Sequence, residues 1–304
     1  MRALVTGING FVGHYLRTEL STRGWDVFGF SLEPPFNETT WKCDLLDTPL
    51  FTSLAQKIRP DVIFHLAGIS SIRMSWKQPE LTMRVNRDGT DSLYRALTSL
   101  NAPVTVLLVS SAEVYGTPKH VPLTELDPPN PSNPYATSKL AAEKVSIAYP
   151  SIRTVIPRSF PHIGPGQRLG FVVPDIAQQI VNCERGESSE LLIGNTQAQR
   201  DFTDVRDVVN AYILLAEHGA PGQLYNVCSG VAYRISDIVE LFIVKAAVPI
   251  TVRHDPSRLR KTDIDILRGD NTKLQQATGW TPHIPLGQTI DDVLAYNRSL
   301  PYQL

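Results

Sequence analysis

Residues 2–13 read Arg2-Ala3-Leu4-Val5-Thr6-Gly7-Ile8-Asn9-Gly10-Phe11-Val12-Gly13, in which a short apolar run leads into three glycines spaced GxxGxxG. Apolar residues at helical intervals follow to Arg23, so the segment predicts a strand, a tight turn and a helix. Gly7 permits the turn, Gly10 lets the backbone approach a phosphate, and Gly13 allows close packing of the helix on the strand. The helix start, which includes Phe11 and Val12, is therefore predicted to hold a dinucleotide pyrophosphate on its amide groups.

The first half of the chain alternates apolar runs with helical patterns, which is typical of βαβ units. Strands are expected at Arg2 to Thr6, Asp26 to Phe30, Asp61 to His65, Val104 to Ser110 and Ile152 to Arg158. Helices are expected at Phe11 to Arg23, Leu46 to Lys57, Val85 to Ser99 and Tyr135 to Tyr149. This order predicts an α/β fold, a Rossmann-type doubly wound parallel sheet.

The pattern changes after Arg158, where proline and glycine cluster and the apolar runs become shorter. We expect residues 1–157 to form the dinucleotide-binding domain and residues 158–304 to form mainly a smaller, mixed α/β substrate-binding domain. A segment near 203–229 is expected to rejoin the first domain, because Leu224 to Cys228 has the composition of a sheet strand. The remaining predicted elements are a strand at Leu191 to Gly194 and helices at Val172 to Glu184, Asp207 to Glu217, Ile235 to Ala246 and Leu286 to Arg298.

The composition of the 304 residues narrows the class of partner. The chain has 29 Lys and Arg and 30 Asp and Glu. Its charges therefore nearly balance, and no strong electrostatic field attracts it to nucleic acid or to a membrane surface. No apolar run reaches the roughly 18 residues of a membrane-spanning helix, and the start does not resemble a signal peptide. Cys43, Cys183 and Cys228 lack the spacing of a metal site. These features predict a cytoplasmic protein that binds small molecules and no metal.

A catalytic pair is predicted on the helix that begins at Tyr135. Tyr135 and Lys139 lie four residues apart and so share one helical face. A nearby ammonium favours the phenolate and lowers the tyrosine pKa, which suits proton transfer. Ser110 and Ser111 end the preceding strand, and the Ser111 hydroxyl is expected to bind the substrate oxygen beside Tyr135.

These motifs resemble those of the extended short-chain dehydrogenases/reductases. Further matches are Asp44-Leu45, which resembles the pair that meets the adenine ring, Leu66-Ala67-Gly68 at a strand end, and Asn86 in an NxxGT helix start. The resemblance implies a nicotinamide dinucleotide and further cofactor contacts at Ser31, Ser110, Tyr135, Lys139, Phe160 and His162, with Lys139 holding the nicotinamide ribose. The second strand ends in Phe30-Ser31-Leu32 without a carboxylate or an arginine, which favours NADP(H), with NAD(H) as the alternative.

The second half resembles the GDP-4-keto-6-deoxy-D-mannose reductases within this family. The matching segments are Arg158 to Gln167, Gly170-Phe171-Val172, Gly194-Asn195, Arg200 to Asp207 and Tyr225 to Gly230, and Arg260 with Asp263 is similar to the RPxE of the GDP-sugar branch. The resemblance implies substrate contacts at Ser70, Ser111, Glu113, Tyr135, His162, Phe171, Val172, Asn195, Arg200, Arg260 and Asp263. Arg200 and Arg260 carry the guanidinium groups that suit a diphosphate. Pro161, Lys261 and Asp263 depart from the branch pattern and leave the exact sugar open.

Several activities start from the same serine, tyrosine and lysine. The resemblance favours reduction of the C4 ketone of a GDP-4-keto-6-deoxyhexose, which forms a product such as GDP-D-rhamnose. A GDP-mannose 4,6-dehydratase needs a further base and acid; Glu113 suits the base, but Ala112 offers no polar group beside it. The sequence also leaves open a nucleotide-sugar 4-epimerase and a nucleotide-binding sensor without turnover. The family further implies a homodimer formed through the helices near Val85 to Ser99 and Tyr135 to Tyr149.

Overall fold

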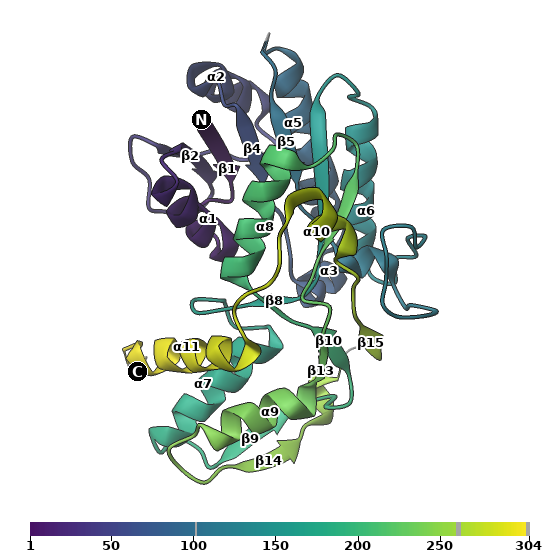
Figure 1. Ribbon diagram of the computed structural model, residues 1–304. Helices are drawn as coiled ribbons and strands as arrows, with labels where there is room; N and C mark the ends of the chain where they lie inside the picture. The colour runs from purple at the N-terminus through teal and green to yellow at the C-terminus, as the bar shows by residue number, and fades with distance from the viewer. Residues whose placement is uncertain (101, 260–262, 302–304) are drawn as a thin grey trace.

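The computed structural model describes residues 1–100, 102–259 and 263–301, and a parallel sheet lies at its centre (Figure 1). The strands of this sheet are β1 (Arg2–Thr6), β2 (Asp26–Ser31), β3 (Thr40–Lys42), β4 (Val62–His65), β5 (Thr105–Leu108), β6 (Ser110–Ser111), β7 (Arg153–Ser159) and β12 (Leu224–Val227). They lie in the order β12-β7-β5-β4-β1-β2-β3, and β6 pairs with β7.

The strand order reverses between β1 and β4. The chain runs outward from β1 through β2 to β3, and then builds the other half of the sheet from β4 through β5 and β7 to β12. This is the doubly wound arrangement predicted from the sequence, and the α/β fold class is confirmed. In such sheets a ligand binds beyond the carboxyl ends of the strands at the reversal.

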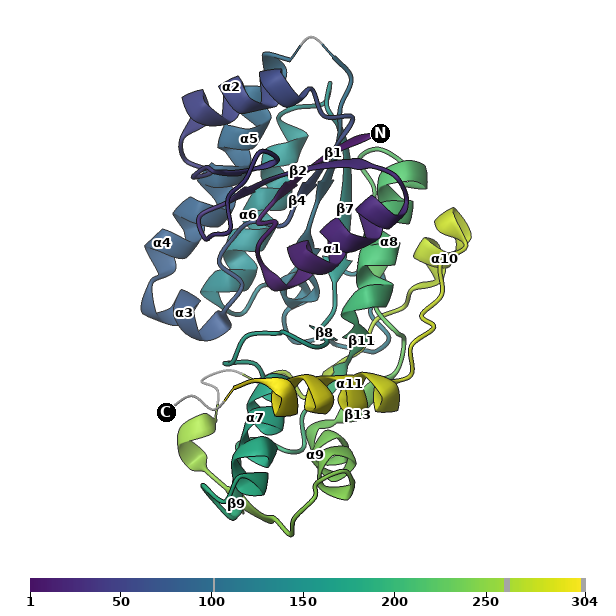
Figure 2. The ribbon, with the colours of Figure 1, turned by 90° about the vertical axis from the view of Figure 1, so that its left-hand side faces the viewer.

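Helices cover both faces of the sheet (Figure 2). The helices are α1 (Phe11–Thr22), α8 (Val205–His218) and α10 (Thr272–Thr278) on one face, and α2 (Thr48–Ile58), α5 (Gly89–Thr98) and α6 (Pro134–Ile147) on the other. Val5 and Phe64 are buried towards the first set, whereas Leu4 and Ile63 are buried towards the second. Because successive strand residues point to opposite faces, β1 and β4 must be apolar along their whole length.

A second hydrophobic core lies beside the carboxyl edge of the sheet, at the bottom of Figure 1. It is built from α7 (Val172–Glu184), α9 (Ile235–Val244), α11 (Leu286–Ser299) and the strand pair β9 (Glu190–Ile193) and β14 (Thr251–His254). Short strands connect it to the first sheet: β8 (His162–Ile163) with β11 (Thr203–Asp204), and β10 (Gln199–Asp201) with β13 (Ala232–Arg234) and β15 (Ile266–Leu267). The domain limits 1–157 and 158–304 remain a prediction.

Some short elements were not expected from the sequence. These are the strands β3, β8, β10, β11, β13, β14 and β15, the helices α3 (Ile72–Lys77), α4 (Pro79–Met83) and α10, and the 3-10 turns η2 (Ala112–Tyr115) and η3 (Pro256–Arg258). They lack the run of three Val, Ile, Leu or Phe residues that marks β4 and β5. The helix expected from Val85 instead begins with a π-helical turn, η1 (Arg84–Asp88), before α5. Within the described ranges, no helix is long and apolar enough to cross a membrane.

Candidate active site

The glycine turn between β1 and α1 forms a tight cradle. Gly7 has φ of +76°, and a Cβ on this residue would lie 3.1 Å from the Ala67 backbone. A Cβ on Gly13 would lie 2.3 Å from the Gly7 carbonyl oxygen. Among the described side chains none caps the start of α1, so its first amide groups are available to an anion. The cradle therefore fits the pyrophosphate of a nicotinamide dinucleotide.

A cavity of about 970 Å³ lies beyond the carboxyl ends of the sheet strands. This volume is at the upper end of the roughly 300–1,000 Å³ of small-molecule sites. The predicted site residues that line it are Gly7, Gly10, Phe11, Val12, Gly13, Ser31, Leu66, Ala67, Gly68, Ser70, Ser110, Ser111, Glu113, Tyr135, Lys139, Phe160, His162, Phe171, Val172, Asn195, Arg200 and Asp263. Residues from both halves of the chain thus surround one space.

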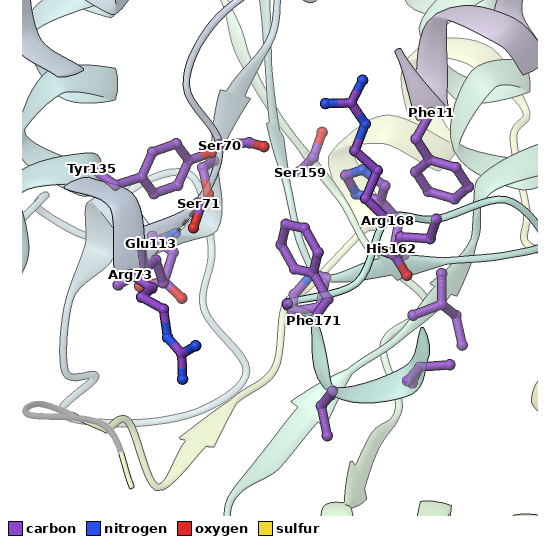
Figure 3. Close-up of a pocket in the computed structure, with 18 of the residues that line it drawn as sticks. Phe11, Ser70, Ser71, Arg73, Glu113, Tyr135, Ser159, His162, Arg168 and Phe171 are labelled. Atoms are coloured by element: carbon purple, nitrogen blue, oxygen red, sulfur yellow. Dashed lines mark hydrogen bonds between the residues drawn. The ribbon is translucent and has the colours of Figure 1, made fainter. Parts of the chain in front are cut away.

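The two sides of the cavity carry different groups. Figure 3 shows on one side Tyr135, Ser70, Ser71, Glu113 and Arg73, and on the other Phe11, His162 and Arg168. Phe171 lies between them. The side with Tyr135 comes from the β4 and β6 ends and from α6, whereas the opposite side combines the α1 start with the loop around β8.

Tyr135 lies at the start of α6 with its ring almost buried. Asn133 fixes this helix start, since its side-chain oxygen accepts a hydrogen bond of 2.8 Å from the Ala136 amide. Burial raises the pKa of Tyr135 to about 12, although a hydrogen bond with Ser111 opposes the shift. The prediction that Lys139 lowers this pKa is not met in the structure, because burial outweighs the other influences. Tyr135 is therefore protonated at neutral pH and able to donate a proton.

Lys139 lies one helical turn after Tyr135 and is buried. Its Nζ donates a hydrogen bond of 2.7 Å to the carbonyl oxygen of Val109. Burial lowers the pKa of Lys139 to about 8, and the Glu143 carboxylate partly offsets this effect. An ammonium held here remains charged at neutral pH and lies on the same helical face as the phenol.

A buried ion pair joins α6 to β7. Arg158 on β7 donates to both oxygens of Glu143 on α6, at 3.0 and 2.8 Å, and both side chains are almost fully buried. Ser110 donates to the same carboxylate, and the Arg158 guanidinium lies 4.7 Å from the ring centre of Tyr115. The network fixes α6 against the strand that carries Ser111, because β6 pairs with β7.

Buried His65 connects the strands at the reversal. Its ring nitrogens contact the hydroxyls of Thr6 at 2.8 Å and Thr90 at 3.1 Å. Burial, together with the Lys139 cation, lowers the pKa of His65 to about 3. A neutral imidazole therefore joins β1, β4 and α5 behind the glycine turn.

Three predicted cofactor residues do not line the cavity. Asn86 is buried in η1, where its side-chain amide holds both the amide and the carbonyl of Ile69 and donates to Ser138 at 2.8 Å. Asn86 thus positions the loop after β4, which does line the cavity. Leu45 packs in the core beside α5, and exposed Asp44 accepts a hydrogen bond from the amide of Leu46.

Three of the predicted substrate residues of the second half, Asn195, Arg200 and Asp263, form one polar cluster. Asp263 accepts hydrogen bonds from the Asn195 side chain at 2.8 Å and from the Arg200 guanidinium at 2.5 Å. Arg200 also donates to the carbonyl oxygen of Ile264 at 2.6 Å. Arg260 lies outside the described residues.

Glu113 and Ala112 occupy the turn after Ser111. Glu113 accepts a hydrogen bond of 3.0 Å from the side chain of Asn133, and its amide donates to the Ser111 hydroxyl at 3.2 Å. Ala112 is buried and presents only a methyl group. No group of three or more His, Cys, Asp and Glu side chains suited to a metal ion occurs in residues 1–100, 102–259 and 263–301.

Sequence analysis missed several cationic residues of the cavity lining. Arg73 and Lys77 come from α3, which begins seven positions after the end of β4, whereas Arg168 comes from a loop and Arg258 from the 3-10 turn η3 of the second half. The rule that parallel sheets bind ligands beyond their strand ends could have indicated α3. Arg168 and Arg258 have no comparable local signal.

Comparison with known proteins shows which proteins this chain is similar to. The family model described as GDP-mannose 4,6 dehydratase matches residues 4–293. The GDP-6-deoxy-D-mannose reductase of Pseudomonas aeruginosa is 35% identical over 300 residues, which are 97% of this chain and 96% of the relative. The solved structure of RMD from Pseudomonas aeruginosa complexed with NADPH has a TM-score of 0.88 at 35% identity and covers 98% of this chain and 99% of its own. A UDP-glucose 4-epimerase from Thermus thermophilus complexed with NAD has a TM-score of 0.87 at 25% identity, over 98% and 99% of the two chains.

Proposed function

This chain belongs to the GDP-mannose 4,6 dehydratase family, and from that membership we propose that it reduces the C4 ketone of a nucleotide-activated 6-deoxy-4-keto-hexose. The proposed substrate is GDP-4-keto-6-deoxy-D-mannose and the proposed product is GDP-D-rhamnose. The observation that carries the proposal is the placement of Ser111, Tyr135 and Lys139 in one cavity with the glycine cradle. The GDP-6-deoxy-D-mannose reductase of Pseudomonas aeruginosa matches nearly the whole chain.

The side chains of the site have distinct tasks in this reaction. A reduced nicotinamide dinucleotide, held by the glycine cradle of Gly7, Gly10 and Gly13, would supply hydride chemistry for the ketone carbon C4. Ser111 donates a hydrogen bond to the ketone oxygen, and Tyr135 transfers its phenolic proton to that oxygen, so that the C=O bond becomes an alcohol. Lys139 stabilises the phenolate that remains on Tyr135.

We propose NADP(H) as the preferred cofactor, with NAD(H) as the alternative. Ser31 stands at the end of β2 in place of a carboxylate that would select NAD by binding both ribose hydroxyls. The Pseudomonas aeruginosa relative was solved with NADPH and the Thermus thermophilus epimerase with NAD. The cavity lining contains groups suited to either dinucleotide.

Dehydration of GDP-mannose is the second candidate function. Glu113 lines the cavity and could act as the base that removes a proton from the sugar. The neighbouring residue that would supply an acid is the buried Ala112, which argues against this reaction. A nucleotide-sugar 4-epimerase needs no acid in addition to Tyr135. It can therefore be distinguished from a reductase only by the products that it forms.

The decisive experiment compares three sugar nucleotides. We expect the purified protein to consume GDP-4-keto-6-deoxy-D-mannose with NADPH or NADH and to release a GDP-6-deoxyhexose, identified by mass and NMR. Loss of water from GDP-mannose without added NADPH would instead identify a dehydratase. Inversion of UDP-glucose would identify an epimerase, and cofactor binding without any turnover would identify a sensor.

We also propose a homodimer and a cytoplasmic location. Exposed Ile147 at the end of α6 lies on one of the helices expected to pair between subunits. Light scattering of the purified chain tests the dimer, and Ile147→Asp is expected to shift it towards the monomer.

A further inference from the structure

Arg168 makes an ion pair across the mouth of the cavity that the proposed proton transfer does not use. It lies in the loop between β8 and α7, and its guanidinium pairs with the carboxylate of Glu33, two residues beyond the end of β2. The two residues are 135 positions apart, and both line the cavity. The side chains are 65% and 56% exposed, so this is a weak surface pair whose partners can be exchanged at little cost.

The segment that carries Glu33 is fixed to the glycine turn. The side chain of Asn9 donates to the carbonyl oxygens of Glu33 at 2.7 Å and Pro35 at 2.9 Å. The amide of Glu33 donates to the Ser31 hydroxyl at 3.0 Å. In a doubly wound sheet the end of the second strand meets the adenosine ribose of a bound dinucleotide. The Glu33 carboxylate is therefore held beside the expected ribose position.

The loop that carries Arg168 is fixed to the start of α1. The Tyr15 hydroxyl donates to the carbonyl oxygen of Pro165 at 2.8 Å. The rings of Phe11 and His162 are stacked, with centres 6.3 Å apart and planes within 6°. Figure 3 shows Phe11, His162 and Arg168 on the same side of the cavity. The second half of the chain thus carries a guanidinium to the adenosine end of the cofactor site.

We propose that the Arg168–Glu33 pair decides between the two dinucleotides. The 2′-phosphate of NADP(H) replaces Glu33 as the partner of Arg168, because a phosphate has more charge and three oxygens for the guanidinium fork. With NAD(H), Glu33 instead accepts a hydrogen bond from the free ribose hydroxyl. The inference rests on the proposed function, since it assumes that a nicotinamide dinucleotide occupies the cavity.

Dissociation constants of NADPH and NADH, measured on the full chain by calorimetry without any sugar, test this proposal. In Arg168→Gln we expect about a tenfold weaker affinity for NADPH and less than about a twofold change for NADH. Glu33→Gln is expected to act in the opposite direction, with tighter NADPH and weaker NADH. Arg168→Lys keeps the charge without the fork and is expected to lie between wild type and Arg168→Gln.

Arg253→Gln is the matched control. Arg253 also pairs through an exposed guanidinium, with Glu190 on β9, but it does not line the cavity. Its removal is expected to change neither constant. If Arg168→Gln left the ratio of the two constants as in wild type, the proposal would be overturned while the proposed function stood. If wild-type protein bound neither dinucleotide, the proposed function itself would fail.

Discussion

Two groups of residues in the cavity lining are held in different ways. The proposed catalytic residues Ser111, Tyr135 and Lys139, here called the catalytic wall, lie on β6 and α6, and burial moves the pKa of both Tyr135 and Lys139. The proposed substrate residues Asn195, Arg200 and Asp263, here called the substrate wall, are joined by side-chain hydrogen bonds to Asp263. Asn195 and Asp263 come from loops and are only partly buried, whereas Arg200 is buried on β10.

The contrast indicates how rate and selectivity are divided in this molecule. Buried groups on regular elements hold a reactive geometry, and a change there is felt in turnover or in stability. Polar groups on loops can be exchanged without disturbing the sheet, and a change there is felt in affinity. The following experiments test that division, from the largest expected effect to the smallest.

Tyr135→Phe should produce the largest effect, because it removes the proton donor and leaves the ring in place. We expect kcat to fall by about a thousandfold, equivalent to about 4 kcal/mol of transition-state stabilisation. Tyr149→Phe is the matched control, since Tyr149 follows the same helix and its hydroxyl contacts Asp91 outside the cavity. Steady-state kinetics check both variants, and wild-type turnover in Tyr135→Phe would refute the catalytic wall.

Glu143→Gln tests the support behind the catalytic wall. It leaves the Arg158 guanidinium buried without a counter-charge, which is expected to lower the free energy of unfolding by about 3 kcal/mol. Glu190→Gln breaks an exposed pair with Arg253 and should cost less than about 1 kcal/mol. Denaturant unfolding measures both variants. Equal losses would show that burial does not distinguish the two ion pairs.

The pH profile of turnover tests the charge on Lys139. Since burial lowers the pKa of Lys139 to about 8, the ammonium is lost as pH rises through that value, while Tyr135 with a pKa of about 12 stays protonated. We expect kcat to fall by about tenfold per pH unit above pH 8. A profile that stayed flat to pH 10 would contradict the assignment.

The lowered pKa of Lys139 also makes the free energy of unfolding depend on pH. An unfolded chain has a lysine pKa of about 10.4, so between pH 8 and that value the unfolded state binds more protons than the folded state. The contribution of Lys139 to the free energy of unfolding must therefore rise with pH in this window. Lys139→Met should lack this rise, which unfolding curves at pH 8 and pH 10 can measure.

Asp263→Asn tests the substrate wall and should have the smallest effect. The change removes the charge that holds Arg200 and Asn195 together, so the sugar nucleotide is expected to bind about five- to tenfold less tightly. In this variant we expect the KM for the sugar to rise and kcat to stay within about twofold. A large loss of kcat with unchanged KM would show that Asp263 acts on turnover and not on affinity, which would contradict the division between the two walls.

The sequence by itself determined the parts whose signals are local. The glycine spacing, the apolar strands and the four-residue interval between Tyr135 and Lys139 each depend on neighbours along the chain. The predicted fold class is therefore confirmed, and the glycine turn and the helix that carries Tyr135 and Lys139 form where the sequence predicted a turn and a helix. The three-residue β3 and the six-residue α3, which lack a run of Val, Ile, Leu or Phe, carried too little pattern to be recognised.

Only the tertiary structure decided which distant groups meet. Asn86 binds Ser138 across 52 positions, Arg200 binds Asp263 across 63, and Arg168 reaches Glu33 across 135. It also decided the direction of the Tyr135 pKa shift, because burial depends on what packs around the ring and not on the lysine four residues away. The physical reason is the same in each case. The type of a residue determines which hydrogen bonds and ion pairs its side chain can form, whereas the fold determines which partner lies within reach and how far the side chain is exposed to water.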